Sequence, residues 1–330
     1  MDEGRVDDGV IRITYYVLRI TFYVLRFRFN LWLVNVTSIR EMKKEEVLIE
    51  ALPYIQKYEG KTFVIKYGGA AMTDPLLKET FGKDVTILRK IGINIIIVHG
   101  GGKEITEIAK KLGIETKFVN GQRYTDEAMV EVVQMVLAGK INKEIVNLIN
   151  CNDGDAIGLS GVDNMLLRAE KIVDGGNDLG LVGRVTSVNV PFIELLLKNG
   201  MMPVIAPLGV GKGGTIFNIN ADLAAGTIAD ALKAEKLVYL SDIEGIVINN
   251  QLISSMTEKE AERLIEQGAI FGGMIPKVRS AFKTLNAGVK KVHIVDGRIK
   301  HSLLLEIFTD EGIGTQMVRE SISKKSGNRT

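Results

Sequence analysis

Short runs of apolar, β-branched residues alternate along this sequence with longer stretches in which apolar side chains have a helical spacing. The short runs lack a polar face, which is typical of strands in a mostly parallel sheet that helices cover on both sides. The predicted strands are residues 62–66, 93–98, 202–206, 236–241 and 291–295. The predicted helices are residues 44–58, 76–91, 103–112, 126–150, 190–199, 221–233, 257–267 and 275–287. The alternation predicts an α/β fold, a three-layer α/β/α sandwich with a mainly parallel open sheet.

Two features divide this pattern into parts. A glycine-rich stretch at residues 209–214 indicates a lobe boundary near residue 210. Residues 152–189 are rich in turn-forming residues, and we expect a β-hairpin within them. Pro53 falls inside the first predicted helix and should kink it. The predicted parts are a kinked N-terminal helix at 42–60, one lobe at 61–210 and a second lobe at 211–330.

The first 41 residues do not fit this pattern. Residues 13–19 and 20–26 are nearly identical tandem copies, Ile-Thr-Tyr-Tyr-Val-Leu-Arg and Ile-Thr-Phe-Tyr-Val-Leu-Arg. Arginines interrupt the apolar residues, which argues against a membrane span, and the preceding acidic residues argue against a signal peptide. We favour a start codon assigned too far upstream, with Met42 as the native start, or else a disordered extension. A hairpin arm and a membrane-surface helix are the alternatives.

Composition limits the partners and the compartment. The 42 basic and 40 acidic residues give a net charge of +2, which offers no case for a nucleic-acid surface. The single cysteine, Cys151, excludes an intramolecular disulfide and fits a reducing, cytoplasmic compartment. Three histidines without cysteine partners do not make a zinc site, so no metal ligands are predicted in the protein itself.

Two lysines stand in settings that suit phosphate chemistry. Lys66 follows an apolar strand and precedes Gly68 and Gly69, whereas Lys277 follows Gly-Gly-Met-Ile-Pro. Asp222 lies between them in the sequence Asn-Ile-Asn-Ala-Asp. Phosphoryl transfer needs rigidly held positive charge and little covalent chemistry by the protein. Two lysines with a carboxylate to orient them therefore predict a small-molecule kinase.

Other motifs supply candidate anion contacts. The sequence His-Gly-Gly-Gly at 99–102 joins a predicted strand to a predicted helix, where backbone N–H groups can hold an anion, although a simple tight turn is the alternative. Arg123 follows a turn signal and is either a surface residue or a bidentate clamp for a carboxylate. Asn218 and Asn220 should share one face of an extended segment, with turn capping as the alternative. Asp222 can equally cap the helix that begins just after it.

The segment Tyr239–Gly245 is a strand that ends in a polar turn. Ligands of open α/β sheets bind at the carboxyl ends of strands, so this turn is a candidate nucleotide contact, with an ordinary loop as the alternative. The sequence Gly-Leu-Ser-Gly at 158–161 is one residue too short for a nucleophile elbow, which disfavours a serine hydrolase. The missing Gly-x-Gly-x-x-Gly pattern weakens a nicotinamide-dependent reductase.

These motifs, in this order, resemble the amino acid kinase family from about residue 44 to about residue 318. The matching sequences are Lys-Tyr-Gly-Gly, His-Gly-Gly-Gly, Asn-Gly-Gln-Arg, Asn-Ile-Asn-Ala-Asp and Gly-Gly-Met-Ile-Pro-Lys. The resemblance implies a carbamate-kinase-like fold with an amino-acid lobe followed by a nucleotide lobe. The implied activity is the phosphorylation of the side-chain carboxylate of N-acetyl-L-glutamate by ATP with Mg²⁺, the second step of arginine biosynthesis. That carboxylate is already ionised at neutral pH, so no general base is required.

The resemblance also implies a role for each motif. Lys66 and Lys277 would stabilise the transferring phosphoryl group, while Asp222 would hold both ammonium groups in place. The implied contacts to N-acetylglutamate are Gly101, Gly102, Arg123 on the α-carboxylate, Asn218 and Asn220. The implied contacts to ATP are Gly68, Gly69, residues 242–247 with Asp242, Gly245 and Ile246, and residues 269–271 with Ala269 and Phe271.

A regulatory layer follows from the same resemblance. Family members that arginine inhibits are hexamers, trimers of dimers, in which an extra N-terminal helix interlaces the dimers, and residues 42–60 look like that helix. The implied arginine site consists of Tyr54, Lys236, His293, Glu306 and Gly312. Glu306 would suit a guanidinium. Alternatively, Tyr54 and His293 are packing residues and Glu306 is a solvated helix charge.

Several alternative functions stay open at this point. Relatives within the family act on aspartate, glutamate, carbamate, UMP or a lysine-pathway N-acylated acceptor. A non-catalytic arginine-sensing protein belongs to another class, but the intact Lys66, Asp222 and Lys277 argue against it. The Asn-Gly-Gln-Arg and Gly-Gly-Met-Ile-Pro-Lys sequences favour N-acetylglutamate. A homodimer or hexamer is the expected assembly, and a nitrogen-regulatory protein is a further partner to test.

Overall fold

The computed structural model describes residues 44–119, 121–174, 177–248, 251–272, 274–309 and 312–319. Residues 1–41, which we interpret as an upstream extension, lie outside the described residues, as do the first two residues of the part at 42–60. Asn120 and Gly273, which belong to two of the motifs, also lie outside them.

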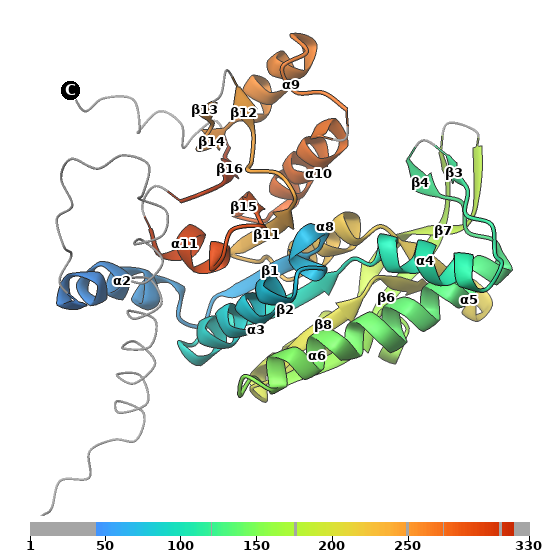
Figure 1. Ribbon diagram of the computed structural model, residues 1–330, viewed down its shortest axis with the longest axis horizontal. Helices are drawn as coiled ribbons and strands as arrows, with labels where there is room; N and C mark the ends of the chain where they lie inside the picture. Colours follow the sequence, from blue (N-terminus) through green and yellow to red (C-terminus); the bar gives the residue numbers. More distant parts are fainter. Residues whose placement is uncertain are drawn as a thin grey trace, which may run out of the picture.

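One eight-stranded sheet forms the middle layer of the molecule (Figure 1). Its strand order is β14-β16-β15-β11-β1-β2-β8-β5. The pairs of β1 with β2 and β11 are parallel, and β16 runs antiparallel to β15. The bounds are β1 Thr62–Tyr67, β2 Asn94–His99, β5 Ala156–Ser160, β8 Met202–Ala206, β11 Lys236–Ser241, β14 Ser255–Met256, β15 Lys291–Asp296 and β16 Thr315–Met317. All five predicted strands are confirmed to within one residue, whereas β5, β14 and β16 were not predicted.

Helices cover both faces of this sheet, as the apolar strands require. Phe63 and Ile65 pack on one face with residues of α3, α6 and α11, while the intervening Val64 packs on the other face with residues of α8 and α10. The bounds are α2 Lys44–Tyr58, α3 Pro75–Lys90, α4 Gly102–Lys111, α5 Glu127–Gln134, α6 Asn142–Asn150, α7 Val190–Lys198, α8 Ala221–Ala231, α9 Glu258–Glu266, α10 Met274–Ala287 and α11 Ser302–Phe308. The three-layer α/β/α prediction is therefore confirmed.

The predicted helix over 126–150 is not a single α-helix. A π-helical segment, Met135–Ile141, joins α5 to α6. Gly139 lies in this segment, and glycine weakens an α-helix, so a departure from α-helical geometry is less costly there. The apolar periodicity of the sequence continues through the segment, which is why the pattern alone did not indicate the change.

Helix α8 begins one residue before Asp222, and Asp222 is not its cap. Asn220 caps the helix, because its Oδ1 accepts hydrogen bonds from the backbone N–H of Asp222 (2.9 Å) and Leu223 (3.2 Å). The capping prediction for Asp222 was therefore wrong, while the alternative reading of Asn220 as a cap is confirmed. The correction leaves the Asp222 carboxylate available for other contacts.

A smaller β-structure lies beside the main sheet. Strands β6 (Leu167–Asp174) and β7 (Asn177–Val188) form the predicted hairpin, and they close into a four-stranded barrel with β9 (Leu208–Val210) and β10 (Ile216–Ile219). The glycine-rich stretch is the turn between β9 and β10. The division into two lobes near residue 210 stays a prediction.

Two short hairpins complete the described fold. Strands β3 (Phe118–Val119) and β4 (Gln122–Arg123) pair beside β7 at one end of the molecule (Figure 1). Strands β12 (Val247–Ile248) and β13 (Gln251–Leu252) pair after β11. None of the described helices combines the length and apolar character that crossing a membrane requires.

Candidate active site

The predicted catalytic residues meet at the carboxyl edge of the main sheet. Lys66 lies near the end of β1, opposite Val98 of β2 and Tyr239 of β11, so three parallel strands end together there. The N-terminus of α8 brings Asp222 to the same edge, where its carboxylate forms an ion pair with the Lys66 ammonium at 2.9 Å. This is the position at which open α/β sheets bind ligands.

The electrostatics of Asp222 match its predicted role. Burial alone would raise the pKa of this carboxyl, but the ammonium groups of Lys66 and Lys277 outweigh burial and hold it below its usual value. Burial lowers the pKa of Lys277, and the nearby charge of Lys66 adds to this effect, while Asp222 opposes it. Asp222 therefore stays ionised between two lysines, which keeps positive charge concentrated at the site.

A serine that the sequence analysis missed holds the second lysine. The Lys277 ammonium donates a hydrogen bond to Ser241 Oγ at 2.8 Å, and Ser241 is buried at the last position of β11. Asp222 contacts Lys66 directly and acts on Lys277 through its charge. The signal that would have found Ser241 is its place as the polar residue that ends a buried strand.

The loop after β1 approaches the turn after β11 closely. The backbone N–H of Ala70 donates to the Asp242 carboxylate in a short contact. Gly69 has a φ of +71°, and a Cβ there would overlap that carboxylate. A Cβ on Gly68 would lie 2.6 Å from Lys66 Nζ. Gly69 is therefore favoured both by its positive φ and by close approach, a side chain at Gly68 would displace the Lys66 ammonium, and Asp242 holds the loop through Ala70.

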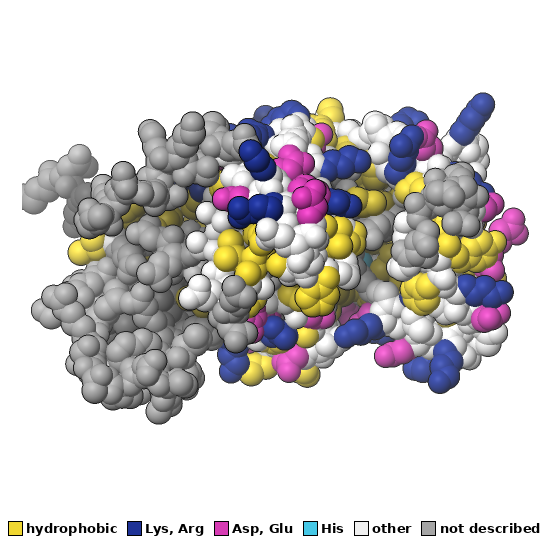
Figure 2. All heavy atoms as spheres, turned by 90° about the horizontal axis from the view of Figure 1, so that it is seen from above, with side chains coloured by type: hydrophobic (Ala, Val, Ile, Leu, Met, Phe, Trp, Pro, Cys, Tyr) yellow, Lys and Arg dark blue, Asp and Glu magenta, His cyan; other side chains and the backbone are white. Residues whose placement is uncertain are grey.

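A pocket opens between this edge and the β3–β4 hairpin. Its lining comes from the glycine loop 100–102, the β3–β4 hairpin, Leu137, and the segment 218–221 that joins β10 to α8. The surface in Figure 2 is hollowed between the central part of the molecule and the part at right, where this hairpin lies. The pocket thus adjoins the Lys66–Asp222 pair through Ala221.

Arg123 is the buried cation of this pocket. Its Nη2 donates to Gly102 O and Thr106 Oγ1, both at 2.8 Å, and its guanidinium lies 4.9 Å from the centre of the Phe118 ring. Its Nη1 is buried and has no hydrogen-bond partner in the described part of the chain. Burial lowers the pKa of this guanidinium. A buried cation with an unpartnered donor fits an anionic ligand.

The remaining predicted substrate contacts also line the pocket. Gly101 and Gly102 begin α4, where the first backbone N–H groups of a helix have no acceptor within the helix. Asn218 lines the pocket and donates to Thr125 Oγ1 at 3.2 Å. Asn220 lines it while capping α8.

The predicted nucleotide contacts after β11 are more scattered. Gly245 has a φ of +125°, and the N–H of the buried Ile246 donates to Thr315 Oγ1 at 2.8 Å. Ala269 closes the turn after α9, and Phe271 has an exposed fraction of 74%. The side chain of Ile246 is thus part of the core, and its backbone carbonyl accepts a hydrogen bond from the Ile253 N–H at 2.8 Å.

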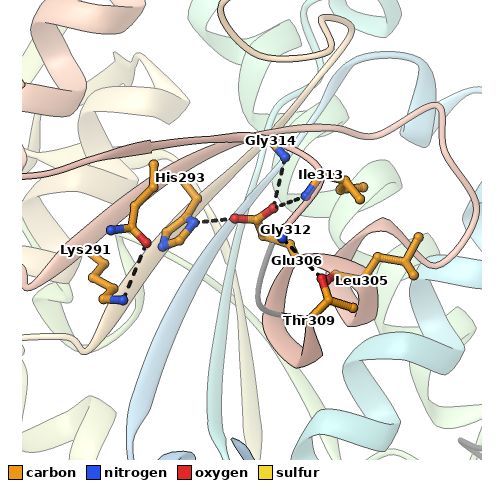
Figure 3. A network of polar contacts seen from close by, with 9 residues as sticks. Lys291, His293, Leu305, Glu306, Thr309, Gly312, Ile313 and Gly314 are labelled. Atoms are coloured by element: carbon orange, nitrogen blue, oxygen red, sulfur yellow. Dashed lines mark hydrogen bonds and ion pairs between the residues drawn. The ribbon is translucent and has the colours of Figure 1, made fainter. Parts of the chain in front are cut away.

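The residues predicted to bind arginine lie on the side of the sheet covered by α2 and α11. Figure 3 shows three of them, His293, Glu306 and Gly312, close together. His293 Nδ1 and Glu306 Oε1 are 2.5 Å apart, and Glu306 Oε2 accepts from the N–H groups of Ile313 (2.8 Å) and Gly314 (3.0 Å). Glu306 is only 6% exposed, so the alternative reading of it as a solvated helix charge was wrong. Gly312, with a φ of +62°, forms the turn beside it.

The protonation of this pair follows from its partners. An ionised carboxylate only accepts, so His293 donates through Nδ1, and burial holds its pKa at about 4. Burial would raise the pKa of Glu306, but the His293 hydrogen bond and the backbone donors lower it. His293 Nε2 is then a buried acceptor without a partner among the described residues.

Lys236 is the buried cation on this side. It is 3% exposed, and its ammonium lies 4.9 Å from the centre of the Tyr58 ring and 5.8 Å from that of Phe63. Burial, helped by Lys291 and Lys57 and opposed by Glu306, lowers its pKa to about 8. Tyr54 packs against the same core from α2.

Groups that could hold a metal ion by themselves are absent from the described residues: no three His, Cys, Asp or Glu side chains gather suitably. Any Mg²⁺ here would depend on phosphate oxygens and water, which it commonly keeps.

Known proteins resemble this chain in sequence and in structure. The model of the amino acid kinase family matches residues 61–296. An acetylglutamate kinase of Chlorobium limicola is 56% identical over 286 residues, which cover 86% of this chain and 93% of that protein.

Two solved proteins are similar in structure. N-acetylglutamate synthase from Neisseria gonorrhoeae, complexed with coenzyme A and N-acetyl-glutamate, has a TM-score of 0.75 and 29% identity, covering 84% of this chain and 64% of that chain. Its complex with coenzyme A and L-arginine has a TM-score of 0.72 at 28% identity, covering 84% and 66%. Carbamate kinase from Giardia lamblia, with a TM-score of 0.58 and 18% identity over 79% of this chain and 99% of that chain, supports the fold alone.

Proposed function

Because the chain belongs to the amino acid kinase family, we propose that it phosphorylates the side-chain carboxylate of N-acetyl-L-glutamate with ATP. The product would be N-acetyl-L-glutamyl 5-phosphate, in the second step of arginine biosynthesis. The observation that carries the proposal is the pocket beside the Lys66–Asp222 pair, in which the buried Arg123 has an unpartnered N–H. The 56% sequence identity to an acetylglutamate kinase, over 86% of this chain, supports N-acetyl-L-glutamate as the acceptor.

The geometry suggests how each residue acts. Arg123 would hold the α-carboxylate of the acceptor, which leaves its side-chain carboxylate near the glycine loop and Lys66. The attacking carboxylate is already ionised, so the barrier is the repulsion between two anions rather than a proton transfer. Lys66 and Lys277 would offset that repulsion in the transition state, in which charge spreads over the phosphoryl oxygens. Mg²⁺ bound with ATP would neutralise further phosphate charge.

The loop 68–70 and the turn after β11 would hold the ATP phosphates. Asp242 fixes the loop through Ala70, so we propose that Asp242 acts by shaping the phosphate site. Gly245, Ile246, Ala269 and Phe271 remain proposed contacts to the rest of the nucleotide.

Arginine inhibition is the second part of the proposal. His293 Nε2 is a buried acceptor without a partner among the described residues, so it could accept a hydrogen bond from an N–H of arginine. The buried Lys236 ammonium, whose charge acts on His293, could pair with the arginine carboxylate. L-Arginine is bound in a structure of the similar synthase. Glu306 already accepts three hydrogen bonds from its own chain, so a guanidinium would share this carboxylate rather than find it free.

Assembly into dimers and hexamers is proposed from α2. Ile49 and Leu52 on this helix are exposed by 69% and 50%, which offers apolar surface for a second copy. Light scattering on the purified chain, with and without arginine, measures the assembly directly. A nitrogen-regulatory partner protein and a cytoplasmic location complete the proposal, and both need separate tests.

The decisive experiment is ATP-dependent acyl-phosphate formation, trapped with hydroxylamine, with N-acetyl-L-glutamate, L-glutamate and L-aspartate as acceptors. We expect product with N-acetyl-L-glutamate alone, and less product when arginine is added. Product with another acceptor would keep the lysine mechanism and change the substrate. No product with any acceptor would overturn the proposed function, and a flat response to arginine would remove the regulatory part.

A further inference from the structure

His99 is a buried histidine that the proposed mechanism does not use. It ends β2 directly before the glycine loop and is completely buried. Its Nδ1 lies 2.9 Å from the carbonyl oxygen of Gly100, the next residue. A polar side chain at such a position is expected to have a full set of hydrogen bonds, and its partners reveal what it holds.

The partners of His99 determine which ring nitrogen carries the proton. A carbonyl oxygen only accepts, so Nδ1 must donate to Gly100 O. On the other side of the ring, Asn142 Nδ2 lies 3.3 Å from Nε2 and is a donor there. His99 is therefore neutral with its proton on Nδ1, and burial lowers its pKa to about 4.

The hydrogen bond to Gly100 fixes the peptide that joins it to Gly101. In a trans peptide the C=O and the N–H point in nearly opposite directions. Because His99 holds the Gly100 carbonyl on the buried side, the Gly101 N–H points away from His99. The N–H of Gly100 is also fixed, since it donates to Tyr67 O at 2.9 Å.

The Gly101 N–H has no acceptor among the described residues. Gly101 is the cap residue of α4, so its N–H has no partner within the helix, and it lines the pocket beside Arg123. This donor is held rigidly by the bonds on the other side of its peptide. A rigid, unpartnered donor at a pocket wall suits the stabilisation of developing negative charge.

The hydrogen bonds from Lys143 through Asn142 and His99 to Gly100 form a chain in which each residue donates to the next. The Lys143 ammonium donates to Asn142 Oδ1 at 3.2 Å, Asn142 Nδ2 donates to His99 Nε2, and His99 Nδ1 donates to Gly100 O. Asn142 Nδ2 also has Val204 O at 2.8 Å and Leu159 O at 3.2 Å within reach, so its two N–H groups are shared among three acceptors, of which His99 Nε2 is one. Hydrogen bonds aligned in this way polarise one another, so the chain strengthens the Gly101 N–H as a donor.

We propose that His99 is a positioning residue for phosphoryl transfer: by holding the Gly100 carbonyl, it aims the Gly101 N–H at the phosphoryl group or the acceptor carboxylate. This inference rests on the proposed function. It assigns to the histidine of the His-Gly-Gly-Gly sequence a task separate from the anion contacts of the glycines. Asn142 then orients the ring and selects its tautomer.

Three substitutions separate this role from simple packing. In His99→Asn the amide nitrogen occupies nearly the place of Nδ1 and can still donate to Gly100 O. In His99→Gln the amide lies one methylene further, near the place of Nε2, so that donor is lost. His99→Leu removes both polar groups and keeps the approximate volume. Asn and Gln are thus a matched pair that differs in where the donor lies.

The test is steady-state acyl-phosphate formation by the wild-type chain and these variants, with thermal unfolding measured in parallel. Loss of one preorganised donor costs about 10²- to 10³-fold in turnover, and loss of its orientation alone should cost about 10- to 100-fold. We expect that decrease in kcat for His99→Gln and His99→Leu, with little change in KM for ATP. His99→Asn should recover most of the activity.

Each outcome decides the inference. Equal kcat in all three variants and wild type would overturn it, as would His99→Asn losing as much turnover as His99→Gln. If His99→Leu does not fold, the comparison of the two amide variants still decides. A wild-type chain without activity would instead overturn the proposed function, which this experiment distinguishes from failure of the inference.

Discussion

The two ends of strand β11 differ in the surroundings of their buried charged groups. At its carboxyl end, Ser241 holds the Lys277 ammonium beside the Lys66–Asp222 pair, and the neighbouring pocket contains an Arg123 N–H that has no partner in the described part of the chain. At its amino end, Lys236 is enclosed by aromatic rings. The sheet thus has a carboxyl edge that we propose is catalytic, with donors directed at a pocket, and an opposite region in which charges are covered by the chain itself.

The difference shows where a ligand would replace water and where it would replace protein contacts. Two donors beside this edge, Arg123 Nη1 and the Gly101 N–H, are held by the fold and have no acceptor among the described residues, so an anion can bind them with little rearrangement. The Glu306 carboxylate, by contrast, already has three donors from its own chain. A ligand there must share or displace these bonds, which suits an effector that changes conformation better than a substrate that turns over quickly.

The largest expected effect is at the catalytic edge. Lys66→Ala and Lys277→Ala should each lower kcat by about 10² or more, because each removes one preorganised positive charge from the transition state. The measurement is acyl-phosphate formation at saturating ATP and acceptor. Lys198→Ala, an exposed lysine in the last turn of α7, is the control and should retain full activity. A fully active Lys66→Ala or Lys277→Ala variant would contradict the assignment of this edge.

The second prediction concerns the covered charge at the amino end of β11. Lowering the pKa of Lys236 from 10.5 to about 8 corresponds to a cost of about 3 kcal/mol for its charged form in the folded state. Lys236→Met removes that cost and also removes ring contacts worth about 1 kcal/mol. We therefore expect the variant to be more stable by about 2 kcal/mol at pH 7, measured by urea unfolding.

The pH dependence of this stability difference tests whether the buried charge of Lys236 causes it. Below pH 8 the lysine is charged in both the folded and the unfolded state, so the full cost is present. Between pH 8 and 10.5 only the unfolded state keeps the proton, so wild-type stability rises and the advantage of Lys236→Met should shrink. Lys198→Met is the control, because this exposed lysine in the last turn of α7 should change stability little. A gain that persists at pH 10 would mean that packing, not charge, is responsible.

The two regions also differ in how far sequence alone could predict them. Strands β1, β2, β8, β11 and β15 are apolar on both faces, and that pattern determines a covered parallel sheet almost without reference to tertiary context. The edge strands β5 and β14 carry a weaker pattern, because an edge strand has only one neighbour and its residues are partly exposed. The π-helical segment was missed because the buried residues through it, Val133, Leu137, Ile141 and Ile145, keep a regular four-residue spacing that an α-helix also shows.

Some side-chain contacts of the site join residues that are far apart in the sequence, and short motifs could not reveal them. The lysines and Asp222 were predictable, because glycines and strand ends surround them in the sequence. Ser241 was not, because its partner Lys277 is 36 residues away and the contact depends on how α10 packs over β11. The burial of Glu306 was likewise hidden, since its donors come from the chain that follows α11.

The smallest expected effect is that of Ser241→Ala, which tests whether Ser241 orients Lys277. Ser241→Ala leaves the Lys277 ammonium without its hydrogen bond, and we expect kcat to fall about tenfold, equivalent to about 1.4 kcal/mol, with KM little changed. If Ser241 acts by orienting Lys277, its substitution should add nothing in a Lys277→Ala background, because the group it orients is already gone. The measurement is therefore a double-mutant cycle in kcat, with the exposed Ser187→Ala in β7 as the control. Two effects that simply add would show that Ser241 works independently of Lys277, and the carboxyl end of β11 would then hold two separate contributions rather than one oriented lysine.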